Sequence, residues 1–327
     1  MARIRVAVSL ALAAFTSFAA FAADPSAQGW ADRPIRFVVP YPAGSSPDLI
    51  ARMLHEPLGR ALGRPVVVDN RPGAGGNIGT ALVARAQPDG HTIGLSIPGP
   101  LAVNTKLYRR LDYDPFTELA PVTMLAVSPN VLVVEPKSGM ASMADFVRAA
   151  KAKPAGLNYG SIGNGSASHL TMELFKHVAG IDVVHVPYAS SPQVNTAIIG
   201  GQVQAGFVVP GTVAPFAQAG RIRMLVQTTA RRTALLPDLP TVAESGYPGF
   251  ESTAWNAVVV PAGTPRPLVD RLHAELTRLL GAEELRAKLA ALYFEPAPGT
   301  PEGLAREMRA ELARWGTVID RTGARVD

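Results

Sequence analysis

Three loops of this chain combine small residues with hydroxyl and amide groups, a composition that can hold an anion. They cover residues 40–48, 70–79 and 160–169, and each lies between a stretch expected to be a strand and one expected to be a helix. Backbone N–H groups without a partner collect at the first turn of a helix, where the helix dipole also favours negative charge. Glycine in such a loop can simply make a tight turn, but three loops at equivalent positions favour a shared anion site.

Other chemistries have weaker signals. The glycines of residues 73–79 follow the pattern G-x-G-x-x-x-G after the second expected strand, without an acidic partner about 20 residues further on, so they do not match a dinucleotide-binding loop. The six histidines form no zinc motif, and the chain has no cysteine. We therefore expect neither a metal nor a cofactor.

A serine nucleophile is an alternative to an anion-binding site. Ser166 and His169 are residue types that could act as a nucleophile and its base, and Ser161 and Ser168 lie nearby. No acid is visible that would orient His169, and the motif G-x-S-x-G does not occur. We favour hydrogen bonding and helix capping for these hydroxyls, and a secreted serine hydrolase is the less favoured function.

Strands are expected where short apolar runs end at proline or glycine turns, and amphipathic stretches between them favour helices. Ser46 is expected to cap one helix, with Pro47 at its first position, and Ser142 with Asp145 another. This alternation is typical of α/β proteins with mostly parallel sheets. The expected strands cover residues 35–39, 65–68, 92–97, 122–134, 158–161, 183–186, 203–209, 222–227 and 255–260.

The rhythm of strand, loop and helix occurs twice along the chain, which predicts two α/β lobes. A length of 327 residues also suggests about two domains of roughly 150 residues each. We place the crossings between the lobes in the long strands near residues 126 and 253. Residues 23–126 and 253–327 then form lobe I, to which three C-terminal helices return, and residues 127–252 form lobe II.

Residues 1–22 have the pattern of a secretory signal peptide. Arg3 and Arg5 precede an apolar stretch over residues 6–21, and residues 20–22 read Ala-Phe-Ala, which fits a cleavage site. A membrane anchor is the alternative, but the stretch is short for the roughly 20 residues that span a bilayer. We expect export and removal of this segment.

Composition argues against nucleic acid as a partner. The formal net charge is +5. Without the leader it falls to +3, because 29 of the 31 basic residues and all 26 acidic residues remain. The basic residues are scattered and not interleaved with aromatic residues. A hydrophobic content of 47% with 17% charged residues is typical of a globular chain.

A series of motifs, in order along nearly the whole mature chain, resembles the tripartite tricarboxylate transporter substrate-binding proteins, also called the Bug receptors. Each motif is short, and their specificity comes from the set. They are Pro40-Tyr41-Pro42-Ala43-Gly44 with Asp48 and Ala51-Arg52, residues 68–79 (VDNRPGAGGNIG), residues 88–92 (PDGHT), residues 163–166 (GNGS) with His169-Leu170, residues 186–188 (VPY), residues 201–203 (GQV), residues 240–248 (PTVAESGYP) and residues 261–265 (PAGTP).

The resemblance implies a periplasmic, two-lobed binding protein of type II-like fold, not an enzyme, that closes around a small carboxylate. Backbone amides, hydroxyls and ordered water would hold the anion. The implied partners are the permease subunits of a tripartite tricarboxylate transporter, or alternatively a signalling sensor, and the receptor is expected to act as a monomer. The ligand-binding residues implied by position are Tyr41, Ser45, Ser46, Ala74, Gly75, Asn77, Ser161, Ser166, His169 and Tyr188.

Three positions depart from the family pattern. Ser45 stands where a second glycine is usual, Ala189-Ser190 replaces Lys-Gly, and residues 207–211 lack a common aspartate. An ammonium group on the ligand would lose one plausible counter-charge there. We therefore expect a small carboxylate without a required ammonium group.

Overall fold

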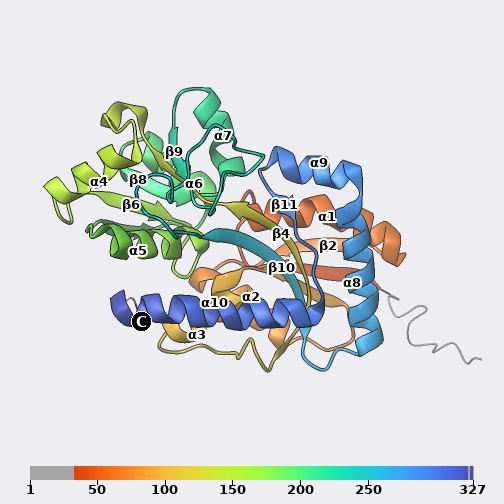
Figure 1. The fold of residues 1–327 in the computed structure, drawn as a ribbon. Helices are drawn as coiled ribbons and strands as arrows, with labels where there is room; N and C mark the ends of the chain where they lie inside the picture. The colour runs from red at the N-terminus through yellow and green to blue at the C-terminus, as the bar shows by residue number, and fades with distance from the viewer. Residues whose placement is uncertain (1–32, 323–324, 327) are drawn as a thin grey trace, which may run out of the picture.

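Short apolar strands that end at glycine and proline turns build two sheets, one in each lobe of the protein (Figure 1). The computed structural model describes residues 33–322 and 325–326, so the expected leader, residues 1–22, lies outside the described residues. The sheet of the first lobe has the order β11-β4-β10-β3-β1-β2, and that of the second lobe has the order β7-β6-β8-β5-β9. The strands are β1 (Ile35–Val39), β2 (Val66–Asn70), β3 (Thr92–Ser96), β4 (Leu119–Pro129), β5 (Val131–Val134), β6 (Asn158–Ser161), β7 (Val184–Pro187), β8 (Ala205–Val208), β9 (Arg223–Gln227), β10 (Thr253–Pro261) and β11 (Glu295–Pro296).

Both sheets are mixed. Strand β1 pairs in parallel with β2 and β3, whereas β10 runs antiparallel to β3 and β4. In the second lobe β6 is parallel to β7 and β8, and β5 is antiparallel to β8 and β9. The two-lobed α/β fold is confirmed, but the sheets are less parallel than expected, because the strands next to the crossings between the lobes enter them antiparallel to their neighbours.

Helices cover both faces of each sheet. In the first lobe α1, α8 and α9 pack on one face, and α2, α3 and α10 on the other. In the second lobe α4 and α5 pack on one face, and α6 and α7 on the other. The helices are α1 (Ser46–Leu62), α2 (Asn77–Ala84), α3 (Asn104–Leu107), α4 (Met143–Ala152), α5 (Ala167–Ala179), α6 (Ser191–Ile199), α7 (Pro210–Gln218), α8 (Arg266–Gly281), α9 (Glu283–Ala291) and α10 (Pro301–Thr322), with short helical turns at Ala74–Gly76, Gly99–Val103 and Pro136–Ser138.

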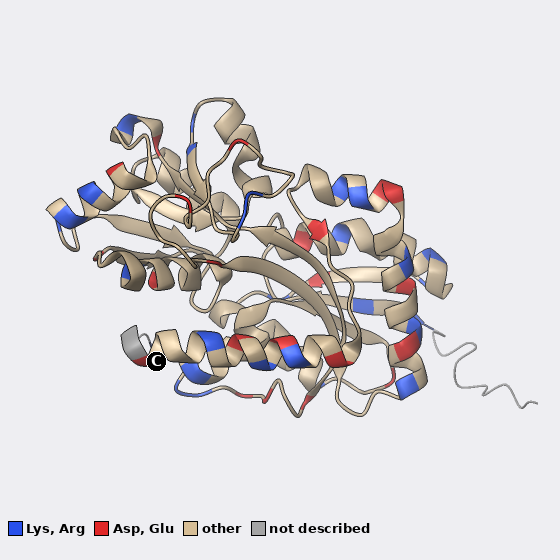
Figure 2. Cartoon of the chain, in the orientation of Figure 1, with Lys and Arg blue, Asp and Glu red and all other residues tan. Residues whose placement is uncertain are grey.

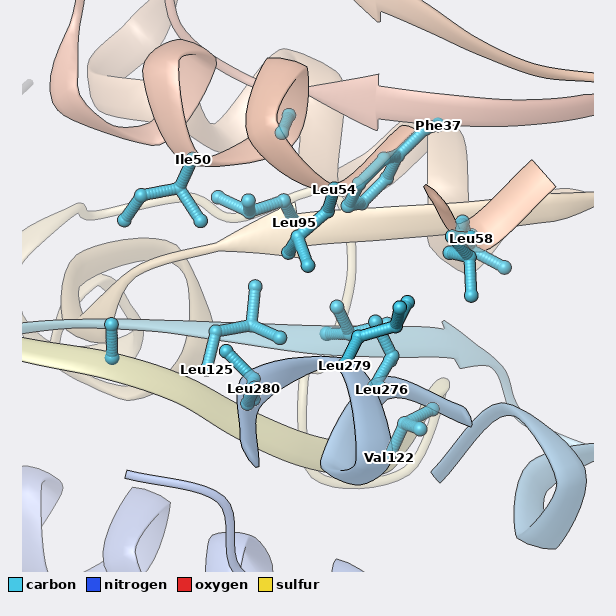
Figure 3. Close-up of a cluster of buried hydrophobic side chains, with 14 of the residues drawn as sticks. Phe37, Ile50, Leu54, Leu58, Leu95, Val122, Leu125, Leu276, Leu279 and Leu280 are labelled. Carbon is cyan, nitrogen blue, oxygen red and sulfur yellow. The ribbon is translucent and has the colours of Figure 1, made fainter. Parts of the chain in front are cut away.

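Helix α1 is held by an apolar stripe. Ile50, Leu54 and Leu58 recur at helical spacing, are buried, and share one core with Leu276 and Leu279 of α8 (Figure 3). Burying one such side chain contributes roughly 1.5–3 kcal/mol. This core fixes the position of α1, and therefore the position of its N-terminus at the edge of the sheet.

Two helices differ from the sequence-based expectation. Helix α1 begins at Ser46 itself, and Ser45 occupies the cap position, where its hydroxyl donates to the carbonyl of Pro42 (2.6 Å) instead of capping the helix. Helix α7 was not expected, because Pro210 and Gly211 have the composition of a turn. Proline is tolerated in the first turn of a helix, where its missing N–H would have no partner in any case.

The two lobes are joined at adjacent points. Strand β4 ends at Pro129, Asn130 follows, and β5 begins in the other sheet, while the return passes from Ser252 into β10. Thr228 ties the two crossings together: its N–H donates to the carbonyl of Asn130 (3.0 Å), and its own carbonyl accepts from the N–H of Ser252 (2.9 Å). Two extended segments bonded through Thr228 therefore connect the lobes.

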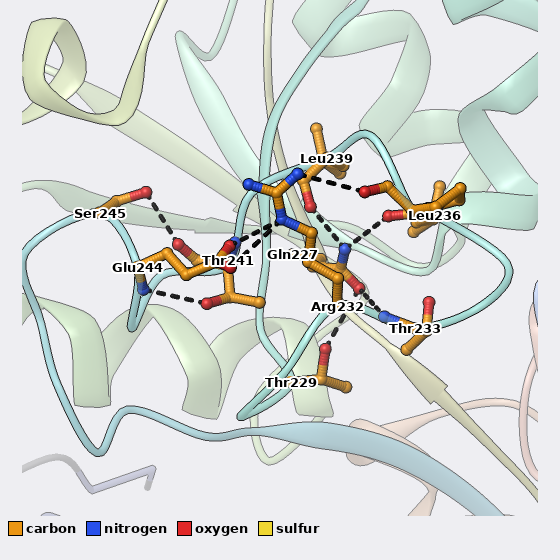
Figure 4. Close-up of polar contacts among 10 residues, drawn as sticks. Gln227, Thr229, Arg232, Thr233, Leu236, Leu239, Thr241, Glu244 and Ser245 are labelled. Carbon is orange, nitrogen blue, oxygen red and sulfur yellow. Dashed lines mark hydrogen bonds and ion pairs between the residues drawn. The ribbon is translucent and has the colours of Figure 1, made fainter.

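The long segment before the second crossing, residues 228–252, is held by the buried side chain of Gln227 (Figure 4). Its Nε2 donates to the carbonyls of Leu236 (2.8 Å) and Leu239 (2.6 Å), and its Oε1 accepts from the N–H of Thr233 (3.1 Å). One amide thus supplies three hydrogen bonds to the part of this segment between Thr233 and Leu239.

Charged residues are interspersed over the surface of the described part of the chain. Figure 2 shows Lys and Arg alternating with Asp and Glu along α8, α9 and α10, as in the ion pairs Arg266–Asp270 and Lys288–Glu284. This pattern agrees with the scattered positions of the basic residues in the sequence. Among residues 33–322 and 325–326, no helix combines the length and the apolar character that a membrane crossing requires.

Replacing Gln227 tests its role in the second lobe. The change Gln227→Met keeps the volume but leaves the carbonyls of Leu236 and Leu239 without their donor, so we expect the free energy of unfolding to fall by about 1–3 kcal/mol. The matched control is Gln218→Met at the exposed end of α7. Equal urea midpoints for the two variants would contradict this role.

Candidate functional site

Two cavities lie between the lobes, and residues from both lobes line each of them. The outer cavity has a volume of about 560 Å³ and the inner cavity about 30 Å³. Ile162 lines both, so the two are neighbours. The outer cavity is lined by Pro40, Tyr41, Pro42, residues 72–76, Tyr108, residues 162–164, residues 187–189 and Val326, and the inner cavity by Ser46, Pro47, Ile97, Pro98, Asn130, Ile162, Ala167, Ser168, Ser191, Val208, Val209, Ala254, Trp255 and Asn256.

The starts of several helices meet at the inner cavity. Ser46 is the first residue of α1, Ala167 of α5 and Ser191 of α6, and Val209 directly precedes α7. Helix N-termini carry partial positive charge and unpaired N–H groups. Of the described residues that line the two cavities, none is Asp, Glu, Lys or Arg. The site therefore favours an anion through backbone dipoles, without a full charge from a side chain.

The acid nearest in sequence to this site, Asp48, has a structural role in the first lobe. Its carboxylate accepts from the N–H of Gly44 (2.9 Å), the amide of Asn70 (2.9 Å) and the guanidinium of Arg52 (2.9 Å). Burial alone would raise the pKa of Asp48, but these hydrogen bonds outweigh it and lower the pKa. Asp48 thus fixes the loop before α1 against the end of β2.

Tyr41 holds the second loop of the first lobe in place. Its hydroxyl donates to the carbonyl of Gly75 (2.8 Å), and its own carbonyl accepts from the amide of Asn70 (2.9 Å). Ala74, Gly75 and Gly76 all have positive φ angles, which bring this backbone into a tight turn at the cavity wall. The loops after β1 and β2 therefore form one bonded unit.

The lobes are closed on each other through glycine backbone. A Cβ atom on Gly75 would lie 2.4 Å from the carbonyl oxygen of Asn164, and one on Gly99 would lie 2.5 Å from that of Gly165. Leu170 of α5 also joins the apolar cluster around α10. Because no side chain intervenes at the glycines, the two lobes approach as closely as backbones allow.

The second-lobe loop is held by its own hydroxyls. Ser166 caps α5: its Oγ accepts from the N–H of His169 (3.3 Å) and donates to the carbonyl of Gly163 (2.6 Å). Ser161 Oγ lies 2.6 Å from Nε2 of His185. The ring of His169 accepts through Nδ1 from the N–H of Gly165 (3.3 Å). These contacts shape the loop that meets Gly75 and Gly99.

The same contacts bear on the hydrolase alternative. The Ser166 hydroxyl is used by Gly163 and by the backbone N–H of His169, and the Nδ1 atom of His169 is used by Gly165. Ser166 and His169 are buried, at 0% and 5% exposure. The arrangement is that of a helix cap and not of a nucleophile bonded to its base.

Burial of two neighbouring imidazoles changes their titration. The rings of His169 and His185 have centroids 4.4 Å apart. Desolvation, with a smaller contribution from nearby Lys176, lowers the pKa of His169 to about 4. Desolvation, followed by the repulsion of His169, lowers the pKa of His185 to about 3. Both rings are therefore neutral at neutral pH, which leaves His169 Nδ1 free to accept from Gly165.

The structure brings half of the sequence-predicted site residues to the cavities. Tyr41, Ala74, Gly75 and Tyr188 line the outer cavity and Ser46 the inner one. The other five line neither cavity and use their polar atoms within the protein; Asn77, for example, accepts from Asn104 (2.6 Å). A ligand contact by these five stays a prediction. They are Ser45, Asn77, Ser161, Ser166 and His169.

Several lining residues were missed by sequence reasoning. Pro98 and Val209 lie within two residues of the ends of β3 and β8, as the expected loops follow strands, and this position was an available signal. Asn130 stands at the crossing between two apolar runs, and Asn256 is the one amide within the apolar strand β10. An isolated polar residue in a buried strand is a signal that could have identified both asparagines.

Comparisons with known proteins place these features in context. The chain matches the model of the tripartite tricarboxylate transporter family receptor over residues 50–324. It is 35% identical to Protein BugT of Bordetella pertussis over 313 residues, which is 95% of this chain and 96% of that protein. The structure of R. palustris Rpa4515 with adipate is similar, with a TM-score of 0.87 and 37% identity, over 90% of this chain and 98% of that chain. MatC (Rpa3494) from Rhodopseudomonas palustris with bound malate is also similar, with a TM-score of 0.84 and 29% identity, over 88% of this chain and 99% of that chain.

The glycine contact between the lobes predicts the effect of one added methyl group. Gly99 has no positive φ angle, so Gly99→Ala adds no backbone strain but places its methyl group against the carbonyl of Gly165. We expect the lobes to be held further apart and the radius of gyration from small-angle scattering to rise. The control is Gly281→Ala, whose methyl group would contact nothing within 4 Å. An unchanged radius for Gly99→Ala would contradict closure through this contact.

The histidine pair predicts a loss of stability in acid. In the unfolded chain both rings take up a proton near pH 6.5, whereas in the folded chain they do so near pH 4 and pH 3. The unfolded state therefore binds more protons, and stability falls as the pH drops from about 6.5 toward 4, by on the order of 3 kcal/mol for His169. Urea unfolding at several pH values measures this, and His185→Gln should flatten the dependence. His177→Gln, at an exposed position of α5, serves as the control, and an equal flattening by it would argue against the buried pair.

Proposed function

The chain belongs to the tripartite tricarboxylate transporter receptor family, whose members are periplasmic solute receptors, and on that premise we propose that it binds a small carboxylate between its two lobes. The observation that carries the proposal is the meeting of helix starts at a cavity that lacks charged side chains. A carboxylate there would accept hydrogen bonds from backbone N–H groups and serine hydroxyls.

Both cavities lack an acidic side chain among the described residues that line them. A ligand ammonium group would therefore be buried without a counter-charge, which costs several kcal/mol. We infer a carboxylate without a required ammonium group. The similar proteins from Rhodopseudomonas palustris with adipate and with malate support this ligand class.

Opening and closing of the lobes admits and encloses the ligand in this proposal. The paired crossings at Asn130 and Ser252 are the hinge, about which the second sheet, from Val131 to Gln227, moves against the sheet that contains β4 and β10. Hinge closure of this kind is usual in two-lobed receptors. The closed contact of Gly75 with Asn164 represents the ligand-enclosing state.

Delivery to a membrane transporter is the role we propose for the closed receptor. After export and removal of residues 1–22, the monomeric receptor would present its closed form to the permease subunits of a tripartite tricarboxylate transporter. Transfer of the same signal to a sensor protein is the alternative. Genes for multi-span membrane subunits beside this one favour uptake, and a sensor kinase gene beside it favours signalling.

An added negative charge at the inner cavity tests the carboxylate site. A thermal-shift panel of mono-, di- and tricarboxylates and amino acids first selects the ligand, because a ligand that binds only the folded state raises its stability. We expect Ser191→Asp, at the start of α6, to weaken the selected carboxylate about tenfold or more by repulsion, while the acid remains favourable for the helix.

The neutral control is Ser191→Asn, which adds the same bulk without the charge and should bind within about threefold of the wild type. Calorimetry measures all three proteins. Equal affinity of Ser191→Asp and Ser191→Asn would show that the carboxylate binds elsewhere. Shifts confined to amino acids in the first panel would show that the ligand class is wrong.

A further inference from the structure

One buried amide at the inner cavity has an unused acceptor. The Oδ1 atom of Asn256 is fully buried and has no hydrogen-bond partner within the described residues 33–322 and 325–326. The residue is 1% exposed and lines the inner cavity. A buried polar atom left without a partner costs free energy, so its retention calls for an explanation.

Strand geometry directs this side chain toward the cavity. Successive side chains of β10 point to opposite faces: Trp255 and Ala257 belong to the cluster under α10, whereas Ala254 and Val258 belong to the cluster under α1. Asn256 follows the alternation of Ala254 and Val258 and so faces the α1 side, where the inner cavity lies.

Two other polar residues of the inner cavity have hydrogen bonds within the protein. The hydroxyl of Ser168 accepts from the N–H of Ile162 (3.2 Å) and contacts Ser166 (2.9 Å). The amide of Asn130 donates to the hydroxyl of Thr171 (3.2 Å). Among the described residues that line the inner cavity, Asn256 has a fully buried acceptor without a partner, and this acceptor is available to a group that enters the cavity.

We propose that Asn256 selects carboxylates that carry a hydroxyl group. This inference rests on the proposed function and specifies its ligand. A hydroxyl donates its proton to Oδ1 of Asn256 and accepts from the amide Nδ2, so one group satisfies both ends of the side chain. A plain aliphatic acid would bury the Asn256 acceptor without a donor. An ammonium group would also donate, but no acidic residue lines the cavity to balance its charge.

The size of the inner cavity agrees with this choice. One water molecule needs about 10–15 Å³ by this measure, so a volume of about 30 Å³ has room for a hydroxyl and the carboxylate oxygen next to it. The neighbouring outer cavity, at about 560 Å³, has room for the body of a small acid. The helix starts around the inner cavity supply N–H groups to the remaining lone pairs of the hydroxyl oxygen or to a carboxylate next to it.

Matched pairs of acids that differ by one hydroxyl test the inference. The pairs are malate and succinate, citrate and tricarballylate, lactate and propionate, and 3-hydroxybutyrate and butyrate. We expect the wild type to bind the hydroxyl-bearing acid of at least one pair about tenfold more tightly in calorimetry. In Asn256→Leu that preference should fall below about twofold, through loss of affinity for the hydroxyl-bearing acid. Asn256→Ala repeats the test with a smaller side chain.

Stability provides a second readout. Because Asn256 Oδ1 has no partner, Asn256→Leu should not lower the unfolding temperature of the ligand-free protein. The control variant Asn195→Leu should lower it, because the Asn195 amide donates to the carbonyl of Thr212 (2.7 Å) away from the cavities. Asn195→Leu should keep the hydroxyl preference.

The outcomes separate this inference from the proposed function. If the wild type binds both acids of every pair equally, as it would if a water molecule satisfied Asn256, the inference is wrong while carboxylate binding stands. A preference that survives in Asn256→Leu and Asn256→Ala also overturns it. If no acid of any pair or of the wider carboxylate panel binds, both the proposed function and the inference fail.

Discussion

The contact of Gly75 and Gly99 with the backbone of Asn164 and Gly165 is the constraint on which the shape of the interlobe site depends. Side chains at these positions would keep the two lobes apart, and the cavities would open to solvent. With glycine, the loops approach closely enough for backbone groups from both lobes to line the two cavities. In the proposed function the low dielectric between the lobes strengthens the helix dipoles there, so that a site without charged side chains would hold an anion.

Hydrogen bonds within the cavity-lining loops position the backbone for this contact. Asp48, Tyr41 and Asn70 join the two first-lobe loops, and Ser166 with His169 shapes the second-lobe loop. These residues have the polarity expected of ligand contacts, yet most of their polar atoms are used in positioning backbone. In the proposed function, specificity is left to the few side chains that face the cavities, among them Asn256, whose buried acceptor has no partner among the described residues.

Sequence reasoning identified the two lobes, the family and the loops, because each depends on local patterns: apolar strands, periodic leucines as in α1, and glycine-rich turns. It was weaker on which side chains reach the cavities. Ser45, Asn77 and Ser166 lie in the correct loops but turn their polar atoms into the protein, and the direction of a side chain in a loop depends on tertiary contacts. Asn256 lies in β10 and Val209 between β8 and α7, and both reach the site only through the packing of the two lobes. Helix α7 was not predicted, because it begins with Pro210 and Gly211, which are typical of a turn.

The position of β10 has a consequence for how the chain acquires its structure. In the first sheet β10 lies between β4 and β3, so residues 35–129 cannot complete that sheet until residues 253–261 arrive. The second sheet, in contrast, is built from one continuous stretch, Val131 to Gln227. During vectorial synthesis or export the second lobe is therefore the first unit with all of its strands available, and the first lobe has to wait with an open sheet edge for its central strand.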